Sequence, residues 1–431
     1  MPSIPRLPFV PDPLRRIRVP DDLDAVTTVA EEERAGDAGL SDEVIERIWD
    51  AGIDLYRSGV HPALQLCVRR EGHVVLDRAI GHVSGNGPDD DDGGAPKVLV
   101  TPEVPYSVMS ASKAVTAMVI HKLIENGALT LEDRISDHIP GYDRHGKSDI
   151  TIGHVLSHRA GVAGMPRDSL DLDKVTDREF ILEAICDAKP NYKPGQLLAY
   201  HAVSGGFILG EVVHNVTGKD IRQVLAEEIL DPLGFRWMNY GVAEADLDAV
   251  GDDYITGPRL LPPFSTIVTR ALGAPINEVI EATNDPRFRR AIVPSANICT
   301  TANELSRFFE ILRCGGELDG VRVFEPGTIR LALTEQSHLE VDFSLGFPTR
   351  FSYGLMLGAK IVSLYGRDTD EAFGHLGLIN IMGWADPERG VSVGLITSGK
   401  AIVYPQLHRF LGVMQRIASE VPKVTYEERP F

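Results

Sequence analysis

The sequence predicts a mixed α/β fold in which one α/β domain is divided by an inserted helical domain. Apolar runs typical of strands gather towards the two ends of the chain, at 64–69, 74–80, 353–357, 379–384 and 391–397. The stretch between them follows helical periodicity instead. Because strands from both ends can share one sheet, this order favours a single interrupted domain. We expect a proline-rich lead at 1–40, an α/β domain formed by 41–130 and 290–431, and a mainly helical insertion at 131–289.

The elements of the first part follow from the spacing of apolar residues. Residues 42–58 place apolar side chains at helical spacing, and Ser41 can cap the first turn. The next two strand-like runs are separated by the turn 70–72, which indicates a hairpin. Residues 107–125 are apolar around nearly the whole helical circumference, so this helix is expected to be buried on most sides.

The later helices and strands are predicted from the same spacing of apolar residues. The turn at 386–390 separates the last two strand-like runs. The sequence shows no internal repeat. Helices are expected at 177–188, 203–216, 219–229 and, near the end of the chain, 406–419.

Composition and charge exclude several classes of protein. The 431 residues include 43 basic and 62 acidic side chains, and the formal net charge of -19 would repel a nucleic acid. The four cysteines form no CxxC pair, which argues against a zinc knuckle or a disulfide scaffold. The N-terminal stretch lacks the apolar core of a signal peptide, and no apolar run reaches the ~18 residues of a membrane span. We therefore expect a cytoplasmic protein that binds neither nucleic acid nor membrane.

Ser110-Ala111-Ser112-Lys113 is the only S-x-x-K tetrad in the chain, and it opens the buried helix. Residues three apart share one face of a helix, so the Lys113 ammonium can reach the Ser110 hydroxyl. Apolar surroundings penalise the charged lysine, and lowering its pKa from ~10 to ~7 requires roughly 4 kcal/mol. A neutral Lys113 can then accept the proton of a nucleophilic Ser110, although a chain this long can also contain one such tetrad by chance.

The tetrad and its surroundings resemble the family of serine β-lactamases, penicillin-binding DD-peptidases and family VIII carboxylesterases. The resemblance implies an antiparallel sheet flanked by helices, a helical insertion, and an acyl-enzyme on Ser110 that needs no cofactor and no metal. It also makes Tyr200 the catalytic tyrosine, whose phenolate beside a lysine cation would share the serine proton with Lys113 and pass it to the leaving group. The resemblance spans about 45–415, and its stretches are 106–113, 129–133, 150–158, 194–200, 205–210, 216–218 and 374–378.

The stretch at 374–378 resembles the family's third motif. The resemblance implies that His375, Leu376 and Gly377 bind substrate on a strand similar to an edge strand of the sheet. It also implies an oxyanion hole that combines the main-chain N–H groups of Ser110 and Leu378. Removing one such donor typically costs ~3 kcal/mol of transition-state stabilisation.

Two departures from the family pattern bear on the substrate. Most β-lactamases have Y-x-N where this chain has Tyr200-His201-Ala202, so the asparagine that grips a substrate amide is missing. Leu376 replaces the hydroxyl residue of K-T-G, which helps to hold a substrate carboxylate. Both changes favour an uncharged ester.

Three other patterns have simpler explanations. The segment 390–394 matches the G-x-S-x-G elbow, but Ser392 lies between a turn and a strand, without the helix that an elbow requires. His154 and His158 have the i, i+4 spacing of a zinc pair on a helix, but the glutamate of H-E-x-x-H is missing, which favours packing. The aspartates at 89–92 lack the spacing of a calcium loop and are typical of a solvated surface.

The sequence thus predicts a serine carboxylesterase whose partner is a small-molecule ester. Three alternatives stay open. An acyltransferase of the same fold would pass the acyl group to an alcohol, a β-lactamase or D-amino-acid peptidase would cleave an amide, and a binding protein on this scaffold would be inactive. The sequence carries no signal for an oligomeric state.

Overall fold

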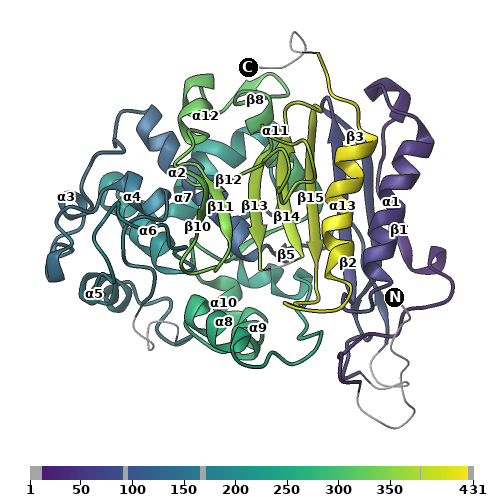
Figure 1. Cartoon of the computed structure of the whole chain (residues 1–431), viewed down its shortest axis with the longest axis horizontal. Helices are drawn as coiled ribbons and strands as arrows, with labels where there is room; N and C mark the ends of the chain where they lie inside the picture. Colours follow the sequence, from purple (N-terminus) through teal and green to yellow (C-terminus); the bar gives the residue numbers. More distant parts are fainter. Residues whose placement is uncertain (1–11, 91–95, 166–170, 379, 426–431) are drawn as a thin grey trace.

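The computed structural model describes residues 12–90, 96–165, 171–378 and 380–425. Its largest feature is an antiparallel sheet that combines strands from both ends of the chain (Figure 1). The strand order is β1-β3-β2-β15-β14-β13-β12-β11-β10, with β4 paired to β3. The predicted fold class is therefore confirmed. The strands are β1 Thr27–Val29, β2 Ala63–Arg70, β3 His73–Ser84, β4 Val98–Leu99, β10 Ser337–Val341, β11 Pro348–Phe351, β12 Met356–Leu357, β13 Phe373–Gly377, β14 Ile381–Asp386 and β15 Val391–Thr397.

Helices cover both faces of this sheet. On one face α1 (Asp42–Tyr56) packs beside α13 (Leu407–Glu420), as Figure 1 shows. The other face carries α11 (Ala302–Arg313), which contacts β2, β14 and β15. Because successive strand residues point to opposite faces, Leu66 of β2 joins the apolar cluster that includes α1 and α13, and Cys67 joins the cluster that includes α11. This double cover explains why β2 is buried along its whole length.

The middle of the chain is mainly helical, with a small three-stranded sheet of order β5-β7-β6. The strands of this sheet are β5 Tyr106–Ser107, β6 Asn239–Tyr240 and β7 Ile298–Thr300, and a separate pair is formed by β8 Glu317–Leu318 and β9 Val321–Arg322. The helices are α2 Ser112–Glu125, α3 Ile135–His138, α4 Ile152–Leu156, α5 Arg178–Asp187, α6 Ser204–Thr217, α7 Ile221–Leu225, α8 Phe264–Leu272, α9 Ile276–Thr283, α10 Pro286–Arg290 and α12 Pro326–Ala332. The proposed division at residues 40, 130 and 290 stays a prediction.

Three predicted elements differ from the structure. The buried helix begins at Ser112 rather than at 107, because Ser107 belongs to β5 and Met109–Ala111 form a 3-10 turn. The helix predicted at 219–229 is divided into α7 and a π-helix, Ala226–Leu230. The strand predicted at 353–357 is reduced to β12, because Gly354 turns at φ 114° against Ala117 of α2.

Parts of three other predictions lie outside the described residues. These parts are the start of the proline-rich lead, the aspartates at 91 and 92, and residue 379 of a predicted strand.

Candidate active site

Ser110 lies in a tight turn between strand β5 and helix α2. The Val108 N–H donates to the Ile298 carbonyl of β7 (2.9 Å), and the chain then turns through Met109 at φ 49°. A left-handed conformation is uncommon for a residue with a long side chain, and such strain gathers at functional sites. The turn Met109–Ala111 is a 3-10 helix. Ser110 lines a cavity of about 300 Å³.

Lys113 approaches Ser110 from the first turn of α2. Its Nζ lies 3.1 Å from Ser110 Oγ and donates to the Ser295 carbonyl at 2.9 Å. Burial of the side chain lowers the pKa of Lys113 to about 7. A lysine with a pKa in this range carries a neutral amine in a substantial fraction of the molecules at neutral pH. Since the Ser295 carbonyl accepts one amine N–H, the nitrogen lone pair is free to accept the Ser110 proton.

The buried Tyr200 completes a group of three polar side chains with the buried Lys113 and the half-buried Ser110. Lys113 Nζ lies 4.9 Å from the centre of the Tyr200 ring. Burial raises the pKa of Tyr200 above its ordinary value, while a hydrogen bond with Ser110 opposes the rise and Asp342 adds to it. Burial thus favours a neutral phenol beside a neutral amine. The phenolate and lysine cation that the resemblance implied would have to overcome the cost of removing two charges from water, and this arrangement of the proton stays a prediction.

Strand β13 carries the third motif past the nucleophile. A Cβ on Gly377 would lie 2.2 Å from the Val108 carbonyl oxygen, so glycine allows the two backbones to touch. The next residue, Leu378, lines the same cavity as Ser110, where their N–H groups are expected to form the oxyanion hole. The edge-strand prediction is wrong for the start of β13, which pairs with β12 as far as Gly374. Beyond Gly374, the described pairing of β13 is with β14 alone.

His375 and Leu376 present different chemistry from a cationic third motif. His375 is 1% exposed, and burial, helped by the nearby Lys113, lowers its pKa to about 3. Its Nδ1 bonds to the Leu376 carbonyl (2.8 Å), so this nitrogen carries the proton. The Leu376 side chain packs with the apolar cluster around Tyr200. A neutral His375 and an apolar Leu376 cannot pair with a substrate carboxylate through charge.

Two further histidines belong to this buried group. His158 and His154 were expected on one helix, but α4 ends at Leu156 and His158 follows it at φ 59°. The His158 ring lies 4.7 Å from the Tyr200 ring and 5.6 Å from the His201 ring. The main-chain N–H of His201 donates to Nδ1 of the His158 ring (3.2 Å), so Nδ1 of His158 is unprotonated. Burial also lowers the pKa of both rings, which adds no cation to the site.

Asp342 anchors the main chain of Tyr200. Its two carboxylate oxygens accept the Tyr200 N–H at 3.1 and 3.0 Å, and one of them also accepts the N–H groups of Ser344 and Leu345 at 2.8 and 2.9 Å. Asp342 is fully buried. No motif in the sequence pointed to this carboxylate, which fixes the loop that carries the tyrosine.

Replacing Asp342 by asparagine should lower kcat for ester hydrolysis by ~10-fold or more, with KM changed by less than ~3-fold. An amide in this place keeps one oxygen but puts an NH₂ opposite the Tyr200 N–H, which shifts the tyrosine rather than the pocket wall. Steady-state kinetics at 25 °C measures both constants. Glu340→Gln, two residues away, is the matched control. A variant of lower thermal stability with an unchanged kcat would show that Asp342 has a structural role only.

The other patterns form no site in the described part of the chain. Ser392 is fully buried in the middle of β15, between β2 and β14. His154 Nδ1 accepts the N–H of Thr151 within its own capping box. All four cysteines are free. Among residues that are described, no group of three or more His, Cys, Asp and Glu side chains is placed to hold a metal ion. No helix in the described ranges is long and apolar enough to cross a membrane.

Known proteins resemble this chain over most of its length. It is 29% identical over 307 residues to the esterase/beta-lactamase LipL of Mycobacterium tuberculosis, which covers 67% of this chain and 68% of LipL. A penicillin-binding protein homologue from Caulobacter crescentus superposes with a TM-score of 0.74 at 25% identity, over 89% of this chain and 98% of the other. A family VIII carboxylesterase superposes with a TM-score of 0.73 at 24% identity, over 88% and 98%.

A model of the family described as Beta-lactamase matches residues 42–407. This match includes every residue of the buried group around Ser110, and the structural likeness gives the same fold. The chain therefore belongs to the beta-lactamase family and has its serine hydrolase fold.

Proposed function

We propose that this protein is a serine carboxylesterase that cleaves small uncharged esters through an acyl-enzyme on Ser110. The observation that carries the proposal is the lining of the cavity that contains Ser110. Most of the lining is apolar, and Glu278 is its one ionisable side chain among the described residues. The apolar lining residues are Met109, Leu172, Val175, Ala202, Val203, Leu272, Ala274, Val279, Ala282, Phe288, Val293, Ala296 and Leu378.

This lining favours an ester over a β-lactam. A β-lactam brings an amide and a carboxylate, and leaving each unpaired on entry costs ~1 to 3 kcal/mol. Among the lining residues that the structure describes, no side chain offers a cation to the carboxylate, and Glu278 adds a negative charge instead. A neutral ester carries neither group, and the apolar walls stabilise its acyl chain by about 0.8 kcal/mol for each buried CH₂.

The proposed reaction uses only residues of this chain and water. Ser110 Oγ attacks the ester carbonyl carbon while its proton passes to the neutral amine of Lys113. The N–H groups of Ser110 and Leu378 stabilise the oxyanion. The Tyr200 hydroxyl then protonates the departing alkoxide and regains a proton from Lys113. Water attacks the acyl-enzyme by the same proton path in reverse, which releases the acid and restores Ser110.

The descriptions of two similar proteins support the proposal. LipL is described as an esterase and beta-lactamase, and one structural neighbour is a family VIII carboxylesterase. The first description joins both activities, so the balance between them has to be measured for this protein.

The test compares a short-chain nitrophenyl ester with nitrocefin. We expect kcat/KM for the ester to be higher by at least ~100-fold, which corresponds to roughly 2.7 kcal/mol. Equal efficiency on nitrocefin would overturn the esterase proposal in favour of a β-lactamase. Adding an alcohol and measuring the new ester formed distinguishes acyl transfer from hydrolysis.

Charge reversal at Glu278 tests whether the charge in the cavity causes the preference for an ester over a β-lactam. The variant E278K should narrow the ratio of ester to nitrocefin efficiency by about 5-fold at low ionic strength, since exposed charges interact by about 1 kcal/mol. The control E281K changes the same charge on the same helix α9, but Glu281 does not line the cavity. An equal effect in both variants would show that net charge, rather than the cavity, selects the substrate.

A further inference from the structure

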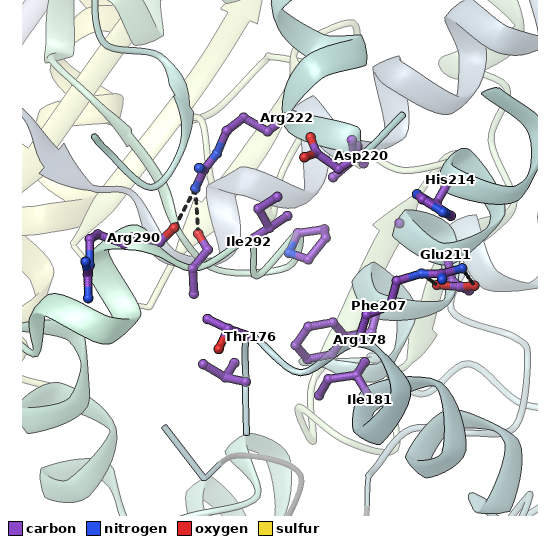
Figure 2. A pocket seen from close by; sticks show the side chains of 15 residues that line it. Thr176, Arg178, Ile181, Phe207, Glu211, His214, Asp220, Arg222, Arg290 and Ile292 are labelled. Carbon is purple, nitrogen blue, oxygen red and sulfur yellow. Dashed lines mark hydrogen bonds and ion pairs between the residues drawn. The ribbon is translucent and has the colours of Figure 1, made fainter. Parts of the chain in front are cut away.

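A second cavity has a volume of about 400 Å³. Figure 2 shows the side chains that line it. Its lining comes from residues 175–176, α5, α6, the start of α7 and the segment 290–294, and it includes none of Ser110, Lys113 and Tyr200. A volume of this size is in the range of sites for small molecules. The apolar part of its lining consists mainly of Val175, Ile181, Phe207, Ile221, Ile292 and Pro294.

The lining of this cavity has more guanidinium groups than carboxylates. Arg178 forms an ion pair with Glu211, with Nε at 3.0 Å, as the dashed lines in Figure 2 show. Arg290 pairs with Glu244 at the surface. The lining thus has three guanidinium groups and two carboxylates in a protein of net charge -19, namely Arg178, Arg222, Arg290, Glu211 and Asp220.

Arg222 is the cation without a carboxylate partner in the described ranges. One of its terminal nitrogens donates to the carbonyls of Arg290 and Ala291 at 2.7 and 3.0 Å, and its buried Nε–H has no acceptor among the described residues. The charge of Asp220 acts on Arg222, but Asp220 forms no ion pair with it among the described contacts, and its oxygen accepts the Gln223 N–H (2.8 Å) as the cap of α7. A guanidinium keeps its positive charge in this state, so it suits an anionic group such as a carboxylate.

The segment 290–296, here called the partition, lies between the two cavities, and Val175 lines both of them. Ile292 and Pro294 line the second cavity, whereas Val293 and Ala296 line the cavity of Ser110. The carbonyl of Ser295, between them, accepts the hydrogen bond of the catalytic Lys113 (2.9 Å).

The partition is held tightly against α6. Ser295 Oγ accepts the Gly206 N–H at 3.0 Å, and a Cβ on Gly206 would lie 2.3 Å from that oxygen. The next residue of α6, Phe207, lines the second cavity. A molecule that fills this cavity therefore contacts α6 and the partition, the two elements that position the Ser295 carbonyl.

We propose that this second cavity is a binding site for a small carboxylate with an apolar chain, and that its occupant changes catalysis through the partition. The carboxylate pairs with Arg222, and the chain lies against Phe207 and Ile292. The Lys113–Ser295 hydrogen bond transmits the effect to the nucleophile.

Octanoate is the probe for binding, measured by isothermal titration calorimetry on the whole protein. Two cavity-filling variants distinguish the sites: I292W fills the second cavity and V279W fills the cavity of Ser110. We expect I292W to abolish octanoate binding and V279W to retain it within ~3-fold. The exposed T176W, at the rim of the second cavity, replaces I292W if the latter fails to fold. Binding lost in V279W and kept in I292W and T176W would overturn the proposal.

Two further measurements test the ligand class and the coupling. R222Q should weaken octanoate binding by at least 10-fold and leave the binding of 1-octanol within ~3-fold, and equal losses for both would refute carboxylate recognition. At saturating ester, where octanoate cannot compete at Ser110, we expect octanoate to change kcat by at least 3-fold in the wild type and not in I292W. Binding with an unchanged kcat would refute the coupling. Since binding is measured without any ester, a failure of the proposed esterase activity leaves the test of the site intact.

Discussion

Replacement of Ser110 by alanine is expected to reduce ester hydrolysis by at least ~10⁴-fold, because the variant has no nucleophile to form the acyl-enzyme. The Lys113 amine lies 3.1 Å from Ser110 Oγ and is held by Ser295, so the chain has a base at this serine. The initial rate on a nitrophenyl ester, with purified protein and a checked thermal unfolding profile, measures the loss.

Ser392→Ala is the matched control for this prediction. Ser392 belongs to the alternative G-x-S-x-G pattern, but it is buried inside the sheet between two strands. We expect this variant to keep at least about half of the wild-type rate. Loss of activity in both folded variants to the same extent would contradict the choice of Ser110.

Hydrolysis should increase with pH through about 7 and then level off, because only the neutral form of Lys113 accepts a proton. Burial lowers the pKa of Lys113 to about 7 from the ordinary value of 10.5. Below that value the ammonium dominates and has no lone pair, so kcat/KM should decrease about 10-fold for each pH unit. Since His375, with a pKa near 3, stays neutral over this range, its ring adds no second step.

Lys113→Ala tests the same group directly. We expect a loss nearly as large as that of Ser110→Ala, and a double variant hardly worse than either, because members of one catalytic unit are not additive. Lys122→Ala is the control on the same helix, where Lys122 bonds to Glu125 instead. A Lys113→Ala variant with normal activity and an unchanged pH profile would contradict the role of this lysine as base.

The relation of Ser110 to Lys113 followed from sequence for a simple reason. Side chains three residues apart align in an α-helix, and they align even more closely in the 3-10 turn that the structure shows at Met109–Ala111. Local spacing therefore gave the correct pair, although the predicted helix began five residues too early.

Contacts between distant segments were beyond the sequence. The Ser295 carbonyl that holds Lys113 is 182 residues away, and Asp342 is 142 residues from Tyr200. Every residue has a main-chain carbonyl, so the sequence does not show which one will bind Lys113. One carboxylate among many has no characteristic spacing that identifies it. The burial that raises the pKa of Tyr200 was beyond the sequence for a related reason, since it arises only when the elements pack together.

His158 shows how one backbone turn changes an assignment. Its spacing from His154 fits a single helix, but the chain turns at φ 59° after α4 and directs His158 towards Tyr200. In contrast, strands β2, β3 and β15 were predicted within a few residues, because long apolar runs with clear turns constrain both ends.

The central claim is that a covalent intermediate forms on Ser110, and labelling with a fluorophosphonate followed by peptide mass spectrometry tests it most directly. The phosphorus atom is attacked as an ester carbonyl would be, the fluoride leaves, and the adduct is stable. The account predicts one adduct for each chain, located on Ser110, with no labelling of the folded Ser110→Ala variant. An adduct on Ser392 or another serine, or no adduct on a protein that hydrolyses esters, would contradict it.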